Sequence, residues 1–365
     1  MDKLDYESNV LPPIANPDLF DHTKAENEFL NAFNSGRLPH AWLITGPKGI
    51  GKATFSHRIA RFILTRNSSS DDTASLFENN LNPDGSGGLD VDITSPICRR
   101  IISGGHPDFL NIERGIDEKT GKLRQGITVK EVRNDRDESR NIPVFFSKTP
   151  SEGGWRVMIV DSADDLNTHA ANTLLKVIEE PPERALILLV SNNPARLLPT
   201  IRSRCRRLSL NFLSDQTIKE LLIKYNPQTT SENLQQLITM AGGSIGLALE
   251  LSNDGGFEIY KEVNEILNMI PEIDMVRLHR LGDKLNRDKT GDVVRHTYSL
   301  ISRWLLNVIK NVAIKNIDSL DGWLEVWETT GHMINKTESL NLDTKQTILN
   351  IFIAIKNISN RVGAN

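Results

Sequence analysis

Apolar runs that end at polar residues alternate with helical patterns through the first part of the chain. The runs have the length and hydrophobicity of strands buried on both faces, and they lie at Ala41–Thr45, Phe109–Glu113, Val157–Val160 and Ala185–Val190. Apolar residues have helical spacing in Lys24–Phe33 and Ala170–Ile178, and Pro181 and Pro182 stop the second of these helices. This alternation predicts an α/β domain built on a parallel sheet.

From Leu210 onward the pattern is helical. The residues from Leu210 to Asp215 lead out of the sheet domain, short amphipathic helices follow, and Gly242-Gly243 breaks the chain before the last of them. Farther on, no strand pattern competes, and a stripe at helical spacing is formed by Leu300, Trp304, Val308 and Val312. We therefore expect three domains, with a polar, mobile surface insertion in the first: 1–212 with the insertion at 66–95, 213–254 and 255–365.

The composition excludes several classes of protein. The chain has 365 residues, 38% of them hydrophobic, and its net charge of −4 provides no global basic field for nucleic acid or an acidic membrane. Two cysteines, Cys98 and Cys205, are too few for a disulfide framework, which fits a reducing cytoplasm. The first residues lack the apolar core of a signal peptide, and no apolar run approaches the ~20 residues of a membrane helix.

The first strand runs directly into G-P-K-G-I-G-K-A-T, which is nearly a phosphate-binding loop. Gly46, Gly51 and Lys52 match the pattern, whose glycines let backbone amides turn toward phosphate oxygens. The hydroxyl that holds Mg²⁺ is missing, because Ala53 takes its position and Thr54 lies one residue late, ~100° around the helix. Weak binding of ATP or ADP and a Gly-rich turn without a ligand both stay open.

An acidic residue follows the third strand. Asp161 lies where P-loop ATPases place a Mg²⁺-liganding Asp, but its neighbour is Ser162, whereas an active ATPase needs a Glu there to polarise the attacking water. A polar strand end or a helix cap is the alternative explanation for Asp161. Because the Mg²⁺ hydroxyl and the Glu are missing at two separate points of one site, the sequence predicts little intrinsic ATP hydrolysis.

Other polar motifs lead to more modest predictions. Cys98, with His106 eight residues later, does not make a zinc site, since zinc needs four ligands, so we expect a small, semi-buried thiol. The tripeptide His106-Pro107-Asp108 also occurs in J-domain co-chaperones, but the strand after it argues against a J domain. A helix is expected to begin at Ile127, and its solvated face, or less favourably a nucleic-acid-binding stripe, would carry Arg133, Arg136 and Arg140.

Four stretches are informative together: L-P-H-A-W-L-I-T-G-P-K-G-I-G-K, G-G-H-P-D-F, M-I-V-D-S-A-D-D-L-N-T-H-A-A-N-T-L-L-K-V-I-E-E-P-P and L-P-T-I-R-S-R-C. They resemble the bacterial clamp-loader subunits of DNA polymerase III, and most closely the delta-prime branch of that family. The resemblance implies an AAA+ ATPase-like module, a small helical lid and a helical collar as the three domains. It also implies partners, namely the gamma/tau and delta subunits and, through the complex, the sliding clamp and primed DNA, but no membrane.

Three departures separate the chain from the ATP-hydrolysing motor subunits of the resembled family. Two are Ala53 and Ser162, and the third is Gly246, which lies where motor subunits carry a nucleotide-sensing Arg. A further departure concerns metal. Related subunits hold zinc with four cysteines before the H-P-D stretch, and only Cys98 remains here, so no zinc is expected.

The resemblance assigns a role to Arg204. In the family, the Arg of Ser-Arg-Cys reaches the ATP of a neighbouring subunit, and the interface motif Ser203-Arg204-Cys205 matches it. The alternative is a basic cluster, Arg202 to Arg207, which lies on a helix end and begins a strand. Asn192 or Asn193 occupies the sensor position after the preceding strand, and their side-chain amides either hydrogen-bond a phosphate or cap a turn. The predicted nucleotide-binding residues of the degenerate site are Gly46, Gly49, Gly51, Lys52, Ala53, Thr54, Asp161 and Asn192.

These features predict a largely non-catalytic subunit that serves as a rigid platform in a pentameric clamp loader of DNA polymerase III. The alternative is a gamma/tau-like motor subunit that hydrolyses ATP in the same complex, and the three departures disfavour it. An independent P-loop kinase would need a second substrate motif and would leave the Ser203-Arg204-Cys205 motif unexplained.

Overall fold

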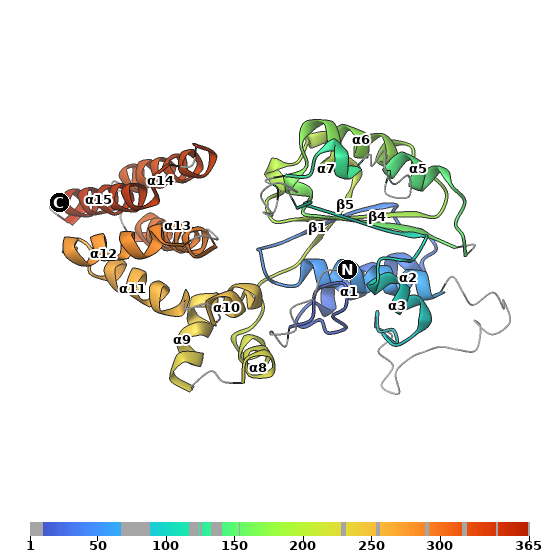
Figure 1. The fold of residues 1–365 in the computed structure, drawn as a ribbon, viewed down its shortest axis with the longest axis horizontal. Helices are drawn as coiled ribbons and strands as arrows, with labels where there is room; N and C mark the ends of the chain where they lie inside the picture. Colours follow the sequence, from blue (N-terminus) through green and yellow to red (C-terminus); the bar gives the residue numbers. More distant parts are fainter. Residues whose placement is uncertain are drawn as a thin grey trace. The chain divides into compact units, whose positions relative to one another are not determined.

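The computed structural model divides the chain into two compact units, Met1–Leu249 and Glu250–Asn365. Figure 1 shows the elements of both units. The structure describes residues 10–66, 88–116, 124, 126–132, 141–152, 154–227, 231–252, 256–288, 292–315, 320–340 and 342–363.

A five-stranded parallel sheet forms the centre of the first unit. Its strands are β1 Ala41–Thr45, β2 Phe109–Glu113, β3 Arg156–Asp161, β4 Ala185–Ser191 and β5 Arg206–Ser209. They lie in the order β2-β3-β4-β1-β5. All residues of β1 are buried because alternate side chains enter two different cores, Trp42 and Ile44 one of them and Ala41 and Leu43 the other. The predicted α/β fold with a parallel sheet is confirmed.

Helices cover both faces of this sheet (Figure 1). One face packs against α1 Thr23–Asn34, α2 Lys52–Arg66 and α3 Pro96–Ile102. The other packs against α4 Val129–Val132, α5 Ile142–Ser147, α6 Thr168–Glu179 and α7 Pro199–Arg204. The start of α6 is fixed by Asn167, whose side-chain oxygen accepts a hydrogen bond from the N–H of Ala170 at 2.9 Å. The helix ends before Pro181 and Pro182, as expected.

Three further helices follow the sheet: α8 Asp215–Tyr225, α9 Ser231–Ala241 and α10 Ile245–Ser252. The break between the last two lies at Gly242-Gly243, as the sequence predicts. The carbonyl of Gly243 accepts a hydrogen bond from the N–H of Leu213 at 2.9 Å, so the segment after α9 returns to the residues that leave the sheet.

The secondary-structure elements described in the second unit are all helices. They are α11 Gly256–Asn268, α12 Met275–Asn286, α13 Asp292–Lys315, α14 Leu320–Leu340 and α15 Thr344–Gly363. Leu300 is buried in the core of this unit, and the other members of the predicted stripe pack against that core as partly buried residues: Trp304, Val308 and Val312. Among the described residues of the whole chain, no helix has the length and hydrophobicity needed to cross a membrane.

Several expectations need correction or lie outside the described residues. The helix expected from Ile127 begins only at Val129, because Ile127 forms an isolated parallel bridge with Leu166. Cys98 is fully buried rather than semi-buried, because α3 packs against α2. Residues 67–87 of the expected insertion, and Arg133, Arg136 and Arg140, lie outside the described residues. The division into three domains stays a prediction.

Candidate functional site: a degenerate nucleotide cavity and an arginine at a helix end

The carboxyl ends of the central strands border a cavity of about 640 Å³ in the first unit. Its walls are formed by the loop at 48–54, by residues between 10 and 20, by the ends of β2 and β3, and by the start of α10. This volume is typical of a pocket for a small molecule. Of the predicted nucleotide-binding residues, Gly46 does not line the cavity, and those that do are Gly49, Gly51, Lys52, Ala53, Thr54, Asp161 and Asn192.

Two glycines allow the loop to take its path. A Cβ atom on Gly46 would lie 2.5 Å from the carbonyl oxygen of Leu210, and one on Gly49 would lie 2.4 Å from the hydroxyl of Ser244. Gly49 also has a φ of +78°, which side chains rarely tolerate. The loop therefore fits closely between the end of the sheet and the start of α10.

Lys52 is buried beside this loop and has a backbone partner. Its Nζ donates a hydrogen bond to the carbonyl oxygen of Pro47. Burial lowers the pKa of Lys52 to about 8, against the attraction of the Asp161 and Asp164 carboxylates. A phosphate group beside this ammonium would raise the pKa again, so binding of a phosphate near pH 8 would be coupled to uptake of protons.

Asp161 shares the end of the sheet with an acid that the sequence analysis missed. Glu113 ends β2 in register with Asp161 on β3, and both line the cavity. Burial and the neighbouring Glu113 carboxylate raise the pKa of Asp161 to about 6. The available signal for Glu113 was its place at the carboxyl end of a buried strand, next to the strand that ends in Asp161.

Asp164 faces the loop after β4. Its carboxylate accepts hydrogen bonds from the hydroxyl of Ser191 at 2.6 Å and from the backbone N–H groups of Asn192 and Asn193 at 2.5 and 3.1 Å. The side-chain amide of Asn192 lies 3.5 Å from the hydroxyl of Ser162. Asn193 caps a turn, because its side-chain oxygen accepts from the N–H of the residue two places later at 3.2 Å. Asp164 thus holds the loop that carries the predicted phosphate-sensing residue.

The change Asp161→Asn is expected to stabilise the first unit at pH 8. An unfolded Asp has a pKa of about 3.9, and the pKa of folded Asp161 is about 6, so folding disfavours the ionised carboxylate. The penalty is absent below about pH 4 and grows as the pH rises through about 6, so the variant should gain about 1–3 kcal/mol at pH 8 and almost nothing at pH 4. Urea denaturation at both pH values, followed by hydrogen exchange of the β3 amides, measures the difference.

Asp164→Asn is the matched control, with the opposite sign. It removes a carboxylate that accepts several hydrogen bonds, so it should lower the free energy of unfolding at pH 8 by about 1–3 kcal/mol. If Asp161→Asn is no more stable than the wild type at pH 8, the cost of ionising the half-buried carboxylate is compensated and the expectation is wrong.

The start of α10 is bound directly to the loop. The N–H of Gly246 donates to the carbonyl oxygen of Gly49 at 2.8 Å, and the hydroxyl of Ser244 donates to that of Lys48 at 2.9 Å. A Cβ atom on Gly246 would lie 2.8 Å from the Cα atom of Gly49. The position that carries an Arg in the motor subunits of the resembled family therefore has no room for a side chain in this arrangement.

Ser203, Arg204 and Cys205 do not line the cavity and lie at the end of α7. The Arg204 side chain is 41% exposed, and its Nη2 atom lies 3.0 Å from Oε1 of Glu179. Its Nη1 atom donates to the carbonyl oxygen of Thr200 at 3.1 Å. Cys205 is buried, which raises the pKa of its thiol to about 12. The chain thus presents the guanidinium at its surface, away from its own phosphate-binding loop.

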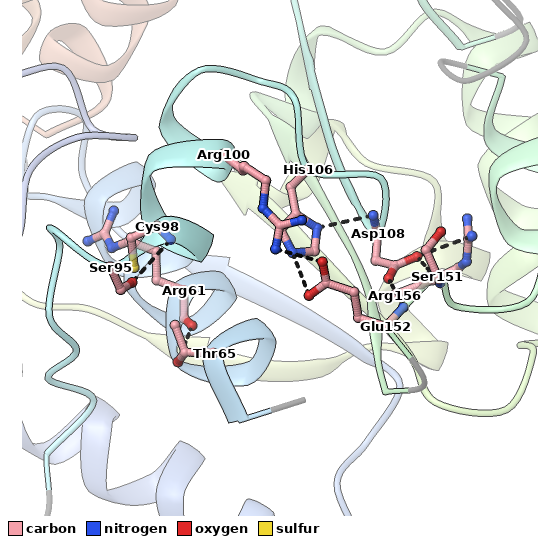
Figure 2. A network of polar contacts seen from close by, with 10 residues as sticks. All are labelled: Arg61, Thr65, Ser95, Cys98, Arg100, His106, Asp108, Ser151, Glu152 and Arg156. Atoms are coloured by element: carbon pink, nitrogen blue, oxygen red, sulfur yellow. Dashed lines mark hydrogen bonds and ion pairs between the residues drawn. The ribbon is translucent and has the colours of Figure 1, made fainter. Parts of the chain in front are cut away.

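Asp108 of the His-Pro-Asp motif organises a buried polar network (Figure 2). Its carboxylate accepts from the backbone N–H groups of Ser151 and Glu152 at 2.9 and 3.1 Å and lies 3.2 Å from Nη2 of Arg156. The Nδ1 atom of His106 accepts from the N–H of Asp108 at 3.1 Å. The motif therefore joins the turn before β2 to the segment that leads into β3.

Among the residues that the structure describes, no group of three or more His, Cys, Asp or Glu side chains is placed to hold a metal ion. The expectation that the chain binds no zinc stays a prediction.

Known proteins resemble this chain over its sheet domain and, in one case, over most of its length. The sequence pattern of the family described as DNA polymerase III, delta subunit, matches residues 21–214. A DNA polymerase III subunit delta' of Pseudomonas aeruginosa is 30% identical over 226 residues, which cover 62% of this chain and 60% of that protein. A DNA polymerase III subunit gamma of Buchnera aphidicola is 26% identical over 329 residues, which cover 87% of this chain and 82% of that protein.

A solved DNA polymerase III gamma subunit-related protein of Thermotoga maritima is 20% identical and covers 72% of this chain and 88% of its own, with a TM-score of 0.38. The family pattern covers more than half of this chain and includes the loop, the strand end at Asp161 and the motif around Arg204. The chain belongs to the DNA polymerase III delta subunit family.

Proposed function

We propose that the chain is a delta-prime-type subunit of a DNA polymerase III clamp loader. It acts in the cytoplasm as a largely non-catalytic platform, together with gamma/tau and delta subunits, in an assembly that opens the sliding clamp and places it on primed DNA. It contributes Arg204 to the ATP site of a neighbouring subunit.

The contact between Gly246 and Gly49 carries this proposal. A motor subunit needs an Arg at the first of these positions, and here the backbones approach so closely that a Cβ atom would lie 2.8 Å from Gly49 Cα. Ala53 and Ser162, which line the same cavity, offer neither the hydroxyl at the position that binds Mg²⁺ nor the carboxylate that polarises water. Three groups that ATP hydrolysis needs are therefore missing around one cavity. Loss of hydrolysis explains this better than a single chance substitution does.

The residues that remain are better suited to bind a phosphate group than to bind a complete Mg²⁺–nucleotide complex. The loop amides and the Lys52 ammonium would hold phosphate oxygens, while Asp161 would be the principal protein ligand for Mg²⁺, a cation that usually keeps several waters. Hydrolysis would then take place in a neighbour's site, where a guanidinium supplied in trans stabilises the charge of the transferred phosphoryl group.

A second candidate is a gamma-type motor subunit of the same complex. The observation in its favour is the Buchnera gamma relative, which matches 87% of this chain. The two candidates differ in one measurable property, because a motor subunit hydrolyses ATP in its own site.

The test compares ATP turnover by the isolated chain with that of the assembled loader. The isolated chain should hydrolyse ATP no faster than background, because the water-polarising Glu and the Mg²⁺ hydroxyl are missing. The complex reconstituted with gamma/tau, delta, clamp and primed DNA should load clamps only when the chain is present. Turnover by the isolated chain that matches gamma/tau and is abolished by Lys52→Ala would establish the motor function instead.

A further inference from the structure

Arg204 is held in place by its own chain at two points. Its Nη2 atom lies 3.0 Å from Oε1 of Glu179, and its Nη1 atom donates to the carbonyl oxygen of Thr200 at 3.1 Å. A guanidinium has five N–H donors. The two contacts therefore leave donors available for a further acceptor while restricting the side chain.

The helices that carry this pair are fixed against each other. Glu179 is the last residue of α6, and Arg204 is the last residue of α7. Ile178 and Cys205, next to the pair in sequence, and Ile201 of α7 are buried in one core on the same face of the sheet. The backbones on both sides of the ion pair are thus set by packing, and the carboxylate of Glu179 is presented at a defined place beside the guanidinium.

The ion pair between Glu179 and Arg204 contributes little to the stability of the fold. Both side chains are 41% exposed, and an ion pair at such a surface adds little to the free energy of unfolding because water and salt screen it. Its effect lies in restricting a long side chain whose rotamers are otherwise free. A guanidinium that must meet a phosphoryl oxygen in a fixed geometry stabilises the transition state better when it is oriented in advance.

We propose that Glu179 is a positioning residue for Arg204, and that it holds the guanidinium in the orientation in which it meets the neighbouring subunit's ATP. The inference rests on the proposed function, since it gives Glu179 a role only if Arg204 acts in trans. Glu179 itself does not touch the nucleotide.

The experiment measures steady-state ATP hydrolysis by the reconstituted complex with clamp and primed DNA. Glu179→Ala should lower the rate at the one site that Arg204 serves about tenfold, through kcat and with the KM for ATP unchanged. The loss of ATP hydrolysis in Glu179→Ala should therefore be nearly as large as the loss in Arg204→Ala. Glu179→Asp, which keeps the carboxylate, should recover part of the loss, and Glu179→Ala should have no further effect in an Arg204→Ala background.

A second exposed ion pair in the same unit supplies the matched control. Glu28 lies 3.1 Å from Nη2 of Arg206, with side chains 40% and 45% exposed. Glu28→Ala should leave hydrolysis at the wild-type rate, which separates a specific effect of Glu179 from the loss of any surface carboxylate near the basic cluster.

The possible results distinguish the positioning role of Glu179 from the role of Arg204 in trans. If Arg204→Ala slows hydrolysis while Glu179→Ala leaves it unchanged or raises it, the positioning role is overturned and the arginine role stands. The positioning role is also overturned if Glu179→Ala acts equally strongly in the Arg204→Ala background. If Arg204→Ala itself has no effect in an intact complex, the proposed role in trans fails, and the inference about Glu179 fails with it.

Discussion

Replacing Arg204 with Ala is expected to reduce clamp- and DNA-stimulated ATP hydrolysis by the assembled loader, and with it the rate of clamp loading. A guanidinium supplied in trans accelerates phosphoryl transfer ~10³–10⁵-fold at the site it serves. Hydrolysis at that site should therefore almost cease. Under the proposed function Arg204 serves only one of several ATP sites, so total hydrolysis should fall in part rather than vanish. Steady-state hydrolysis and loading by the reconstituted complex measure both effects.

The variant should remain folded and assembled. Arg204 is exposed and takes part in one surface ion pair, which is worth about 0–1 kcal/mol. Arg204→Lys should not restore the rate, because an ammonium does not reproduce the planar fork of a guanidinium on a phosphoryl group. A complex that contains Arg204→Ala, assembles normally, and hydrolyses and loads at the wild-type rate would make Arg204 an ordinary surface residue.

Asp108→Ala is expected to be the most destabilising of the substitutions considered. It would remove the buried acceptor of two backbone N–H groups and leave the buried guanidinium of Arg156 without its carboxylate (Figure 2). Removing one partner of a buried ion pair costs about 3–5 kcal/mol. For a unit of this size, the loss corresponds to a fall in melting temperature of roughly 10 °C. Differential scanning calorimetry of the full chain measures it.

Glu152→Gln is the control for this prediction, because it changes the exposed end of the same network. The Glu152 carboxylate pairs with Arg100 at 2.6 Å, and the two side chains are 22% and 44% exposed. The change leaves the backbone N–H that Asp108 binds in place, so it should alter the free energy of unfolding by less than about 1 kcal/mol. An Asp108→Ala variant that is as stable as Glu152→Gln would mean that water replaces the carboxylate without loss.

The local elements were predictable because their signals are local. Strands that are buried on both faces consist of apolar runs. The four predicted runs correspond to β1, β2, β3 and β4. The end of α6 before Pro181 and the break before α10 follow from backbone chemistry that proline and glycine impose. The short strand β5 was less visible, since only Leu208 of its four residues is buried.

The burial of charged groups was not predictable in the same way. Asp108 and Arg156 lie in separate motifs of the sequence and become partners only because β2 and β3 are neighbours in the sheet. For the same reason Glu113 joins Asp161 at the cavity, although nothing in the spacing of these two residues pairs them. Strand order is decided by packing across long separations in the chain, which a sequence pattern does not contain.

The sequence by itself determined the chemistry that is present: a phosphate-binding loop with Ala53, a strand end with Asp161 followed by Ser162, and the Ser203-Arg204-Cys205 motif. These are identities of residues, and no folding changes them. Only the tertiary structure decided which of them share a site. It gathers the loop and Asp161 around one cavity and places Arg204 outside it, beside Glu179. The physical reason is that side-chain contacts depend on how the strands and helices pack, whereas residue identity limits only what each contact can do.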